Sequence, residues 1–165
     1  MRTAIPWVVF AAALAALLAG HGHGGPAASS TTMRARVLRV VDGDTIQVRL
    51  DGGATERVRY IGIDTPESVK PGTPVQCFAK KASHFNSGLV AGRDVTLKTD
   101  AEDRDRYGRL LAYVYAGPEF VNRELVARGY ARTLTIPPNV AHADEFARLA
   151  RRAREAGLGL WRACS

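Results

Sequence analysis

Cysteine is scarce in this sequence, with two residues, Cys77 and Cys164, in a chain of 165. Two cysteines are too few for a disulfide-dense mini-protein and too few for a zinc site built from four cysteines. The chain also lacks internal repeats, and its one biased tract is a short Gly- and His-rich linker near residue 21. Hydrophobic residues make up 46% and charged residues 24%, which excludes a largely disordered chain and, at this length, indicates one domain.

Acidic residues are outnumbered in the composition. The chain has 16 Asp and Glu against 23 Lys and Arg, for a formal net charge of +7. The corresponding isoelectric point is about 9.9. This balance favours an anionic partner such as nucleic acid, phosphate or an acidic membrane surface.

Charge is absent between Arg2 and Arg34, and residues 4–19 are almost wholly apolar. A short positive start, an apolar core and small residues downstream predict a secretory signal peptide. The apolar run is somewhat short for a spanning helix, so an uncleaved N-terminal anchor is the less favoured alternative. We therefore assign 1–28 to the signal or anchor and a linker, 33–165 to the folded domain, and the protein to a secreted, periplasmic or cell-envelope location. In an oxidising compartment Cys77 and Cys164 could pair, the alternative being two unrelated buried thiols.

Apolar periodicity gives the secondary structure. Alternation with a period of two predicts strands over 35–41, 45–50, 55–63, 94–98 and 110–115, while helical spacing predicts helices over 76–90, 122–128 and 141–156. Asn122 is a candidate helix cap and Gly129 a left-handed stop. Five strands, with one helix between the third and fourth and two at the end, predict an α+β fold. We expect a five-stranded oligonucleotide-binding (OB) β-barrel with about three packed helices.

The last predicted helix is rich in arginine and could contact a nucleic-acid backbone. Asp144 precedes Arg148 by four residues, and Arg151 precedes Glu155 by four. Such spacing favours intrahelical ion pairs, so a solvated, salt-bridged face is the preferred interpretation.

Three polar clusters, at 41–45, 59–67 and 104–109, lie at predicted strand ends and turns. Each taken alone is typical of a turn or a hairpin tip. Together they hold two carboxylates that suit calcium or magnesium, Asp44 and Asp64, and a spare carboxylate, Glu67. They also hold two guanidinium groups, Arg59 and Arg109, whose planar forks match phosphate oxygens. These are the parts that phosphodiester hydrolysis needs: a cation to screen the diester, a base for water and donors for the extra charge of the transition state.

The chain resembles the staphylococcal nuclease (thermonuclease) family in its exported bacterial form. The matching segments follow the family's order: VVDGDT (40–45), VRYIGIDTPE (58–67), DRYGRLLAYVY (105–115), VNRELVARGYA (121–131) and GLWRAC (159–164). The resemblance implies an OB barrel that hydrolyses DNA and RNA with calcium, cleaving the 5′ P–O bond and leaving 3′-phosphate ends.

By motif, the resemblance also assigns the site. Calcium would be held by Asp44, Asp64 and the carbonyl of Thr65. Glu67 would be the general base, and Arg59 and Arg109 would hold the phosphate and stabilise the transition state. The remaining assigned residues, which line the phosphate-binding rim, are Arg106 and Tyr107.

One segment departs from the family pattern. The type member has two tyrosines near the nucleotide base, whereas 132–139 contains no aromatic residue here. The alternative function is a noncatalytic nucleic-acid-binding OB domain, but members of that kind typically lose the metal carboxylates or the base, which this chain retains. No assembly signature is apparent, so we expect a monomer without an obligate protein partner.

Overall fold

The structure is a computed structural model that describes residues 30–68, 72 and 74–164. The predicted signal or anchor segment, 1–28, lies outside these residues. Within them, no helix combines the length and the apolar character needed to cross a membrane.

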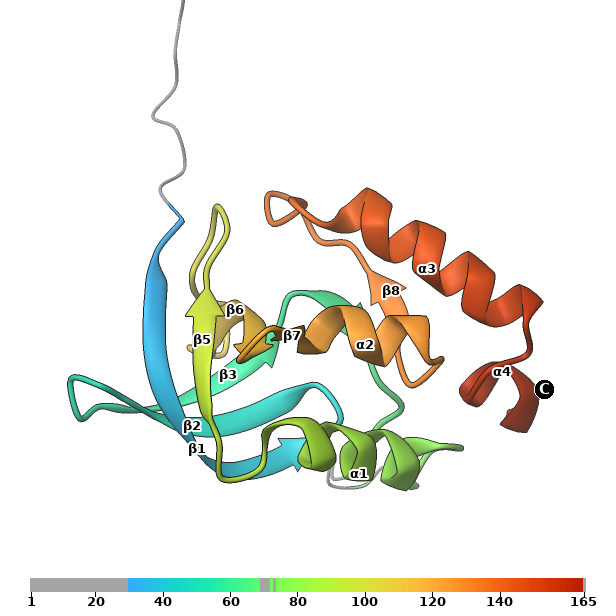
Figure 1. Ribbon diagram of the computed structural model, residues 1–165, viewed down its shortest axis with the longest axis horizontal. Helices are drawn as coiled ribbons and strands as arrows, with labels where there is room; N and C mark the ends of the chain where they lie inside the picture. The colour runs from blue at the N-terminus through green and yellow to red at the C-terminus, as the bar shows by residue number, and fades with distance from the viewer. Residues whose placement is uncertain (1–29, 69–71, 73, 165) are drawn as a thin grey trace, which may run out of the picture.

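Five strands form a closed barrel (Figure 1). They are hydrogen-bonded in the order β3-β2-β1-β5-β6, and a parallel pairing between β3 and β6 closes the sheet. Their bounds are β1 Thr32–Asp42, β2 Thr45–Leu50, β3 Thr55–Tyr60, β5 Asp94–Lys98 and β6 Leu110–Ala116. The predicted OB-type barrel of the α+β class is therefore confirmed. Two short strands were not predicted: β7 Glu119–Phe120, which pairs with β6, and β8 Arg132–Leu134.

The alternation in the strand sequences fills the barrel. Ile46 and Val48 of β2 and Val58 of β3 are fully buried, while the residues between them are polar. Removing such side chains from water is the main stabilising contribution of the barrel. Leu38 breaks the alternation of β1: it lies at a register shift between Val37 and Arg39 and is 44% exposed.

The third predicted strand is shorter than expected, because the chain turns at Gly62. Gly62 has φ +78°, and a Cβ atom there would lie 2.8 Å from the ring of Phe146. β3 therefore ends at Tyr60, and β4 (Gly62–Asp64) pairs with β8 instead of extending the barrel. This turn carries Asp64 out of the barrel sheet.

Three principal helices pack around the barrel, as expected: α1 Ala79–Val90, α2 Val121–Ala127 and α3 Ala143–Glu155. A short helix that was not predicted, α4 Leu160–Ala163, follows. Gly129 ends α2 with φ +73°, as predicted. The prediction for Asn122 was wrong: Phe120 is the cap, and Asn122 lies inside α2. Its side chain accepts the N–H of Val114 at 2.9 Å and donates to the carbonyl of Ile61 at 2.9 Å, joining the helix to the barrel.

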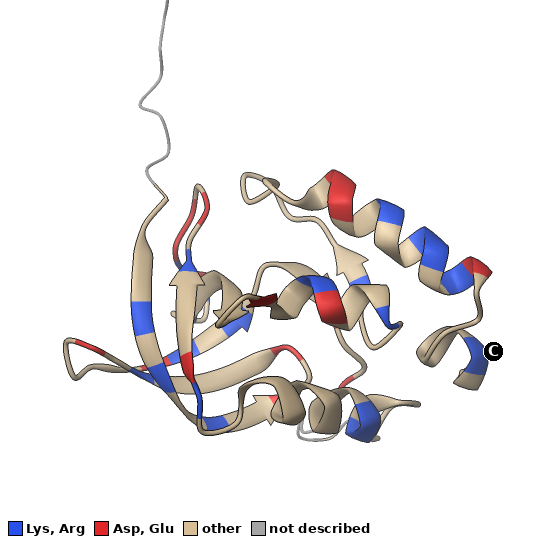
Figure 2. Cartoon of the chain, viewed as in Figure 1, with Lys and Arg blue, Asp and Glu red and all other residues tan. Residues whose placement is uncertain are grey.

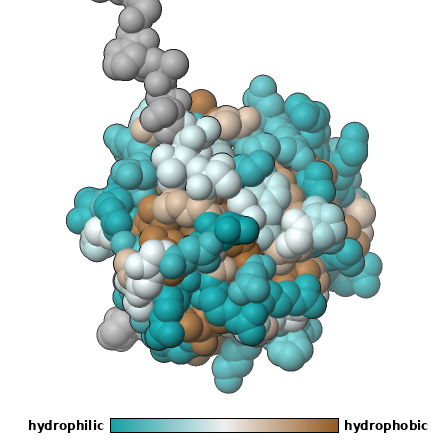
Figure 3. Space-filling view, turned by 60° about the vertical axis from the view of Figure 1, so that its left-hand side comes forward, coloured by the Kyte–Doolittle hydropathy of each residue, from teal (hydrophilic) through white to brown (hydrophobic). Residues whose placement is uncertain are grey.

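The surface is basic on two sides. Figure 2 shows Lys and Arg residues on the strands of the barrel and along α3. Figure 3, which turns the β1 side forward, shows hydrophilic side chains over much of that face.

In the described part of the chain, α3 forms neither of the two expected ion pairs; Glu145 instead bonds to His142 at 2.9 Å and approaches Arg123 of α2 at 3.9 Å. The expectation of ion pairs on this face was wrong, whereas the face is solvated as expected: Asp144, Arg148, Arg151 and Glu155 are exposed.

Candidate active site

A cavity of about 600 Å³ opens where the β1–β2 turn, the segment after β4 and the loop before β6 meet. It is lined by most of the residues singled out in the sequence: Asp44, Arg59, Asp64, Thr65, Glu67, Tyr107 and Arg109. Arg106 lies outside it and lines a neighbouring cavity of about 510 Å³, to which Tyr107 also contributes. Three clusters that are separate in the sequence, at 41–45, 59–67 and 104–109, therefore contribute to one cavity.

Asp44 is held in place by the chain around Thr65. Its carboxylate accepts the Thr65 backbone N–H at 2.7 Å and the Thr65 hydroxyl at 2.9 Å. The approach is close because residue 43 is glycine: a Cβ there would lie 2.6 Å from Thr65 Oγ1. Gly43, between Asp42 and Asp44, therefore allows the turn to pack closely against the segment that carries Thr65.

Arg59 joins the two predicted metal carboxylates. Its guanidinium forms an ion pair with Asp44 and donates from Nη2 to Asp64 Oδ1 at 2.8 Å. The Nη1 atom is buried and its contact with Asp44 lacks hydrogen-bond geometry. Asp44 is buried, whereas the Asp64 side chain is 53% exposed toward the cavity. Burial raises the pKa of Asp64, Arg59 opposes that shift, and the nearby charge of Asp44 adds to it.

The donor set fits a hard cation. The carboxylates of Asp44 and Asp64 both pair with the guanidinium of Arg59, so they lie close enough together to hold positive charge between them. Calcium prefers such oxygen ligands. Across 30–68, 72 and 74–164, no group of three or more His, Cys, Asp or Glu side chains is arranged to hold a metal. The protein ligands would then be Asp44, Asp64 and a backbone carbonyl such as that of Thr65, with water and substrate completing the coordination.

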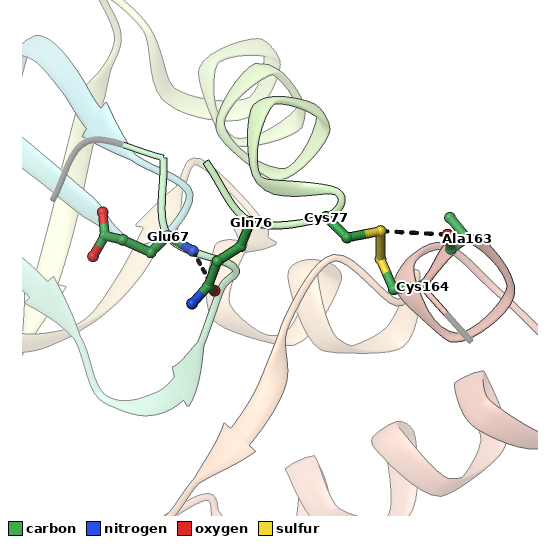
Figure 4. The surroundings of a disulfide bond; sticks show 5 residues. All are labelled: Glu67, Gln76, Cys77, Ala163 and Cys164. Atoms are coloured by element: carbon green, nitrogen blue, oxygen red, sulfur yellow. Dashed lines mark hydrogen bonds between the residues drawn. A yellow bond between two sulfur atoms is a disulfide. The ribbon is translucent and has the colours of Figure 1, made fainter. Parts of the chain in front are cut away.

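Glu67 is positioned through its backbone. Its N–H donates to Gln76 Oε1 at 2.8 Å, and its carbonyl accepts the N–H of Gln76 at 3.0 Å. The next residue, Cys77, forms a disulfide with Cys164, so the pairing considered from the sequence is present in the structure. Figure 4 shows the Glu67 carboxylate pointing away from Gln76 and from the disulfide. The disulfide therefore fixes the element that holds Glu67 without approaching its carboxylate.

Asp42 also lines the cavity, although it was not among the site residues predicted from the sequence. Its side chain accepts the Ser68 hydroxyl at 2.7 Å and the Gly43 N–H at 2.8 Å. Burial raises the pKa of Asp42, the bond from Ser68 opposes this, and a hydrogen bond with Glu67 raises it further. In the sequence, Asp42 could have been identified by its position two residues before Asp44, but Asp and Gly are also ordinary turn residues.

Arg109 is oriented by Asp105 of its own loop. Its Nε donates to Asp105 Oδ2 at 2.7 Å, and Asp105 Oδ1 accepts the N–H groups of Tyr107 at 2.9 Å and Arg109 at 3.0 Å. Burial alone would raise the pKa of Asp105, but these bonds lower it overall. The two Nη atoms of Arg109 make no hydrogen bond or ion pair with any residue that the structure describes. They remain available to an anionic ligand.

The neighbouring cavity is the more apolar of the two. Arg106 donates to the Tyr107 hydroxyl at 2.6 Å, and Tyr107 is 68% exposed. Leu134 and Ile136, which are 40% and 61% exposed, line the same space. The segment 132–139, which has no aromatic residue, therefore contributes aliphatic side chains to the wall of this cavity.

Known proteins resemble the chain over most of its length. The sequence profile of the staphylococcal nuclease homologue family matches residues 57–163. A thermonuclease from Staphylococcus intermedius is 43% identical over 144 residues, which cover 86% of this chain and 85% of the relative. A thermonuclease from Staphylococcus hyicus is 41% identical over 126 residues, covering 76% and 74% respectively. The SPbeta prophage-derived endonuclease YokF of Bacillus subtilis is 42% identical over 125 residues, covering 74% of this chain and 42% of that protein.

Proposed function

The chain belongs to the staphylococcal nuclease family, and from that premise we propose that it is an exported, calcium-dependent nuclease acting on DNA and RNA. It would hydrolyse the 5′ P–O bond and leave 3′-phosphate ends. The observation that carries the proposal is the convergence of two metal-type carboxylates, a further carboxylate and two arginines on one cavity.

Calcium, when bound by Asp44, Asp64 and the Thr65 carbonyl, would supply positive charge that screens the anionic diester. Arg59 is already aimed at this place by its bonds to both carboxylates. The Arg59 side chain is 13% exposed and lines the cavity, so phosphate oxygens that enter the cavity can meet it. Electrostatic interactions are stronger in such a partly dehydrated position than in water.

Glu67 would accept a proton from the attacking water. Its backbone is fixed by Gln76 at both the N–H and the carbonyl, which limits movement of the carboxylate relative to the cavity. A base held within reach of the nucleophile contributes about 10²–10⁴ in rate. Water attacks phosphorus, the bond to the 5′ oxygen breaks, and that oxygen leaves as a hydroxyl after taking a proton from solvent.

Arg109 would stabilise the transition state rather than donate that proton. A guanidinium has a pKa above about 12, which makes it a poor acid near neutral pH. Its Nε atom is already bonded to Asp105, its two Nη atoms are free of hydrogen bonds to the described residues, and the residue lines the cavity. Such donors, fixed before the reaction, match the charge that develops on the phosphoryl oxygens.

Hydrolysis of a 5′-labelled single-stranded oligonucleotide tests the proposal. We expect cleavage with calcium, loss of cleavage with excess chelator, and labelled products whose mobility shifts after phosphatase removes a 3′-phosphate. Products with 3′-hydroxyl ends would contradict the assigned bond, and cleavage in chelator would contradict the calcium requirement. Recovery of the protein from the cytoplasmic fraction would contradict export.

A further inference from the structure

Arginines gather on the outer face of the barrel beside the cavity. Successive residues of a strand point to opposite faces, and Val48 of β2 and Val58 of β3 are buried in the barrel. Residues next to them therefore point outward. Among these are Arg49 and Arg57, and on β1 Arg39 is also exposed. We refer to Arg39, Arg49 and Arg57 as the arginine track.

The register brings the track together. Gln47 of β2 lies opposite Arg39 on one side and Arg57 on the other, so these three form one row across the sheet. Arg49 lies two residues further along β2 from Gln47. Neighbouring strands are about 4.8 Å apart and residues two apart on a strand are separated by about 6.6 Å. The track therefore places three guanidinium groups on one small patch of sheet.

The track leads into the cavity. The next row of the same face contains Thr45 opposite Arg59, with Asp42 beyond Thr45 on β1. These three line the 600 Å³ cavity, and Arg57 lines it as well. Arg57 is therefore shared by the cavity and the track, and an extended ligand leaving the cavity along the strands meets Arg57 before Arg49.

The track is free of partners. The side chains of Arg39, Arg49 and Arg57 make no hydrogen bond, ion pair or ring contact with any residue in the described ranges. By contrast, Arg34 and Arg36 on the same face are neutralised by Asp51 and Asp94, at 3.1 Å in each pair. Like charges gathered without counter-charges create a positive potential that attracts a polyanion. A chain of phosphodiesters is the polyanion that the neighbouring cavity would already hold.

We propose that the arginine track binds the phosphates of the same nucleic-acid strand beyond the bond that is cleaved. The proposal rests on the nuclease function above and adds to it a binding surface for strands longer than the cavity. α3 is the other basic surface, and it supplies a matched comparison. Arg148, Arg151 and Arg152 are exposed and make no contact of these kinds with the described residues, but they line neither cavity.

The test compares the salt dependence of binding in two variants of the protein that each replace three arginines by glutamine. Both carry Glu67→Gln and are kept in chelator so that the probe, a fluorescein-labelled 20-nucleotide single strand, is not consumed. One variant has Arg39→Gln, Arg49→Gln and Arg57→Gln. Each phosphate contact contributes about 0.7 to the slope of log K against log salt for a single strand. We expect the track variant to lower the magnitude of the slope by about 2 and to bind at least about tenfold more weakly at 0.1 M salt.

The control variant has Arg148→Gln, Arg151→Gln and Arg152→Gln and loses the same charge from α3. We expect it to keep the slope of the parent protein. An unchanged slope in the track variant would overturn the proposal. Equal decreases of the slope in both variants would also overturn it, because the loss of net charge alone would then explain the weaker binding. If the triple variant is unstable, Arg49→Gln alone should lower the magnitude of the slope by about 0.7.

Because binding is measured without cleavage, the two proposals can fail separately. If the track variant lowers the slope but the wild-type protein cleaves no nucleic acid, the nuclease function is refuted and the track remains a binding surface. If the wild-type protein cleaves nucleic acid but the track variant keeps the slope of log K against log salt, the proposed role of the track is refuted and the nuclease function stands.

Discussion

Replacing Asp105 by asparagine should release Arg109 while leaving the fold of its loop in place. Asn keeps an oxygen that can accept the N–H groups of Tyr107 and Arg109, as Asp105 Oδ1 does now. Its amide nitrogen, however, would face the Arg109 Nε–H, which Asp105 Oδ2 accepts at 2.7 Å. Two donors repel each other, so the guanidinium would turn away from its present direction.

The magnitude follows from the exposure of the pair. A hydrogen bond to a charged group contributes about 1.5–3 kcal/mol when well shielded. The Arg109 and Asp105 side chains are 27% and 17% exposed, so solvent screening reduces this to about 1 kcal/mol of unfolding free energy. Loss of one oriented donor to the transition state costs about 10²–10³ in rate. Because Arg109 remains present and only its orientation is lost, we expect kcat to fall about 10- to 100-fold.

The assay measures kcat and KM on single-stranded DNA together with unfolding in urea at several pH values. The pKa of Asp105 is lowered in the folded protein, so its contribution is present above the unfolded value of about 3.9. That contribution is lost as the pH falls through the lower folded value. The stability difference from the variant should therefore shrink in acid. Asp103→Asn removes the same charge from an exposed place in the same loop and is the control. Wild-type kcat in a folded Asp105→Asn protein would refute the orienting role.

Three further predictions concern other contacts. Changing Cys77 and Cys164 to serine should lower the unfolding free energy by about 2–4 kcal/mol, measured in urea, because the bond closes a loop with a sequence separation of 87; an unchanged midpoint would show that the bond does not form. Ile136→Tyr should tighten single-strand binding about fivefold or more, since stacking of a base contributes about 1–3 kcal/mol; unchanged affinity would show that bases do not enter the second cavity. Gly43→Ala should greatly reduce activity, because its Cβ would lie 2.6 Å from the Thr65 hydroxyl; full activity with calcium would show that the turn can shift without cost.

Local patterns in the sequence predicted much of the fold. The bounds of β2 and β5 agree with the prediction, and β6 extends one residue beyond its predicted end, because alternation between polar and apolar residues directly reflects which side chains face the barrel. Gly129 ends its helix as expected because a positive φ is a local property.

Features set by distant contacts were missed. The end of β3 depends on Phe146, which packs over Gly62 from more than 80 residues away. Asn122 looks like a cap in sequence, but the barrel offers its side chain two backbone partners, at Val114 and Ile61. Glu145 likewise bonds with His142 and approaches a helix that lies beside α3. In each case a tertiary partner outweighs the local pattern.

The candidate site was predictable in content but not in arrangement. The types of residue that suit metal, base and phosphate were visible in the three clusters. The sequence did not reveal that Arg59 bridges Asp44 and Asp64, or that Gln76 holds Glu67 beside the disulfide. Nor did it select Asp42, whose hydrogen bond to Glu67 depends on how the β1–β2 turn meets the segment after β4.

The most direct test of the account is the rate at which Glu67→Gln protein cleaves single-stranded DNA in calcium, compared with wild type. Binding of the same strand is measured alongside. Because Gln has nearly the same shape and cannot accept the proton of water, we expect the rate to fall about 10²–10⁴-fold with binding changed only a few-fold. A variant that cleaves at the wild-type rate would contradict the role of Glu67. A wild-type protein that binds the strand but fails to cleave it, whichever divalent metal is added, would contradict the nuclease function and leave a nucleic-acid-binding barrel.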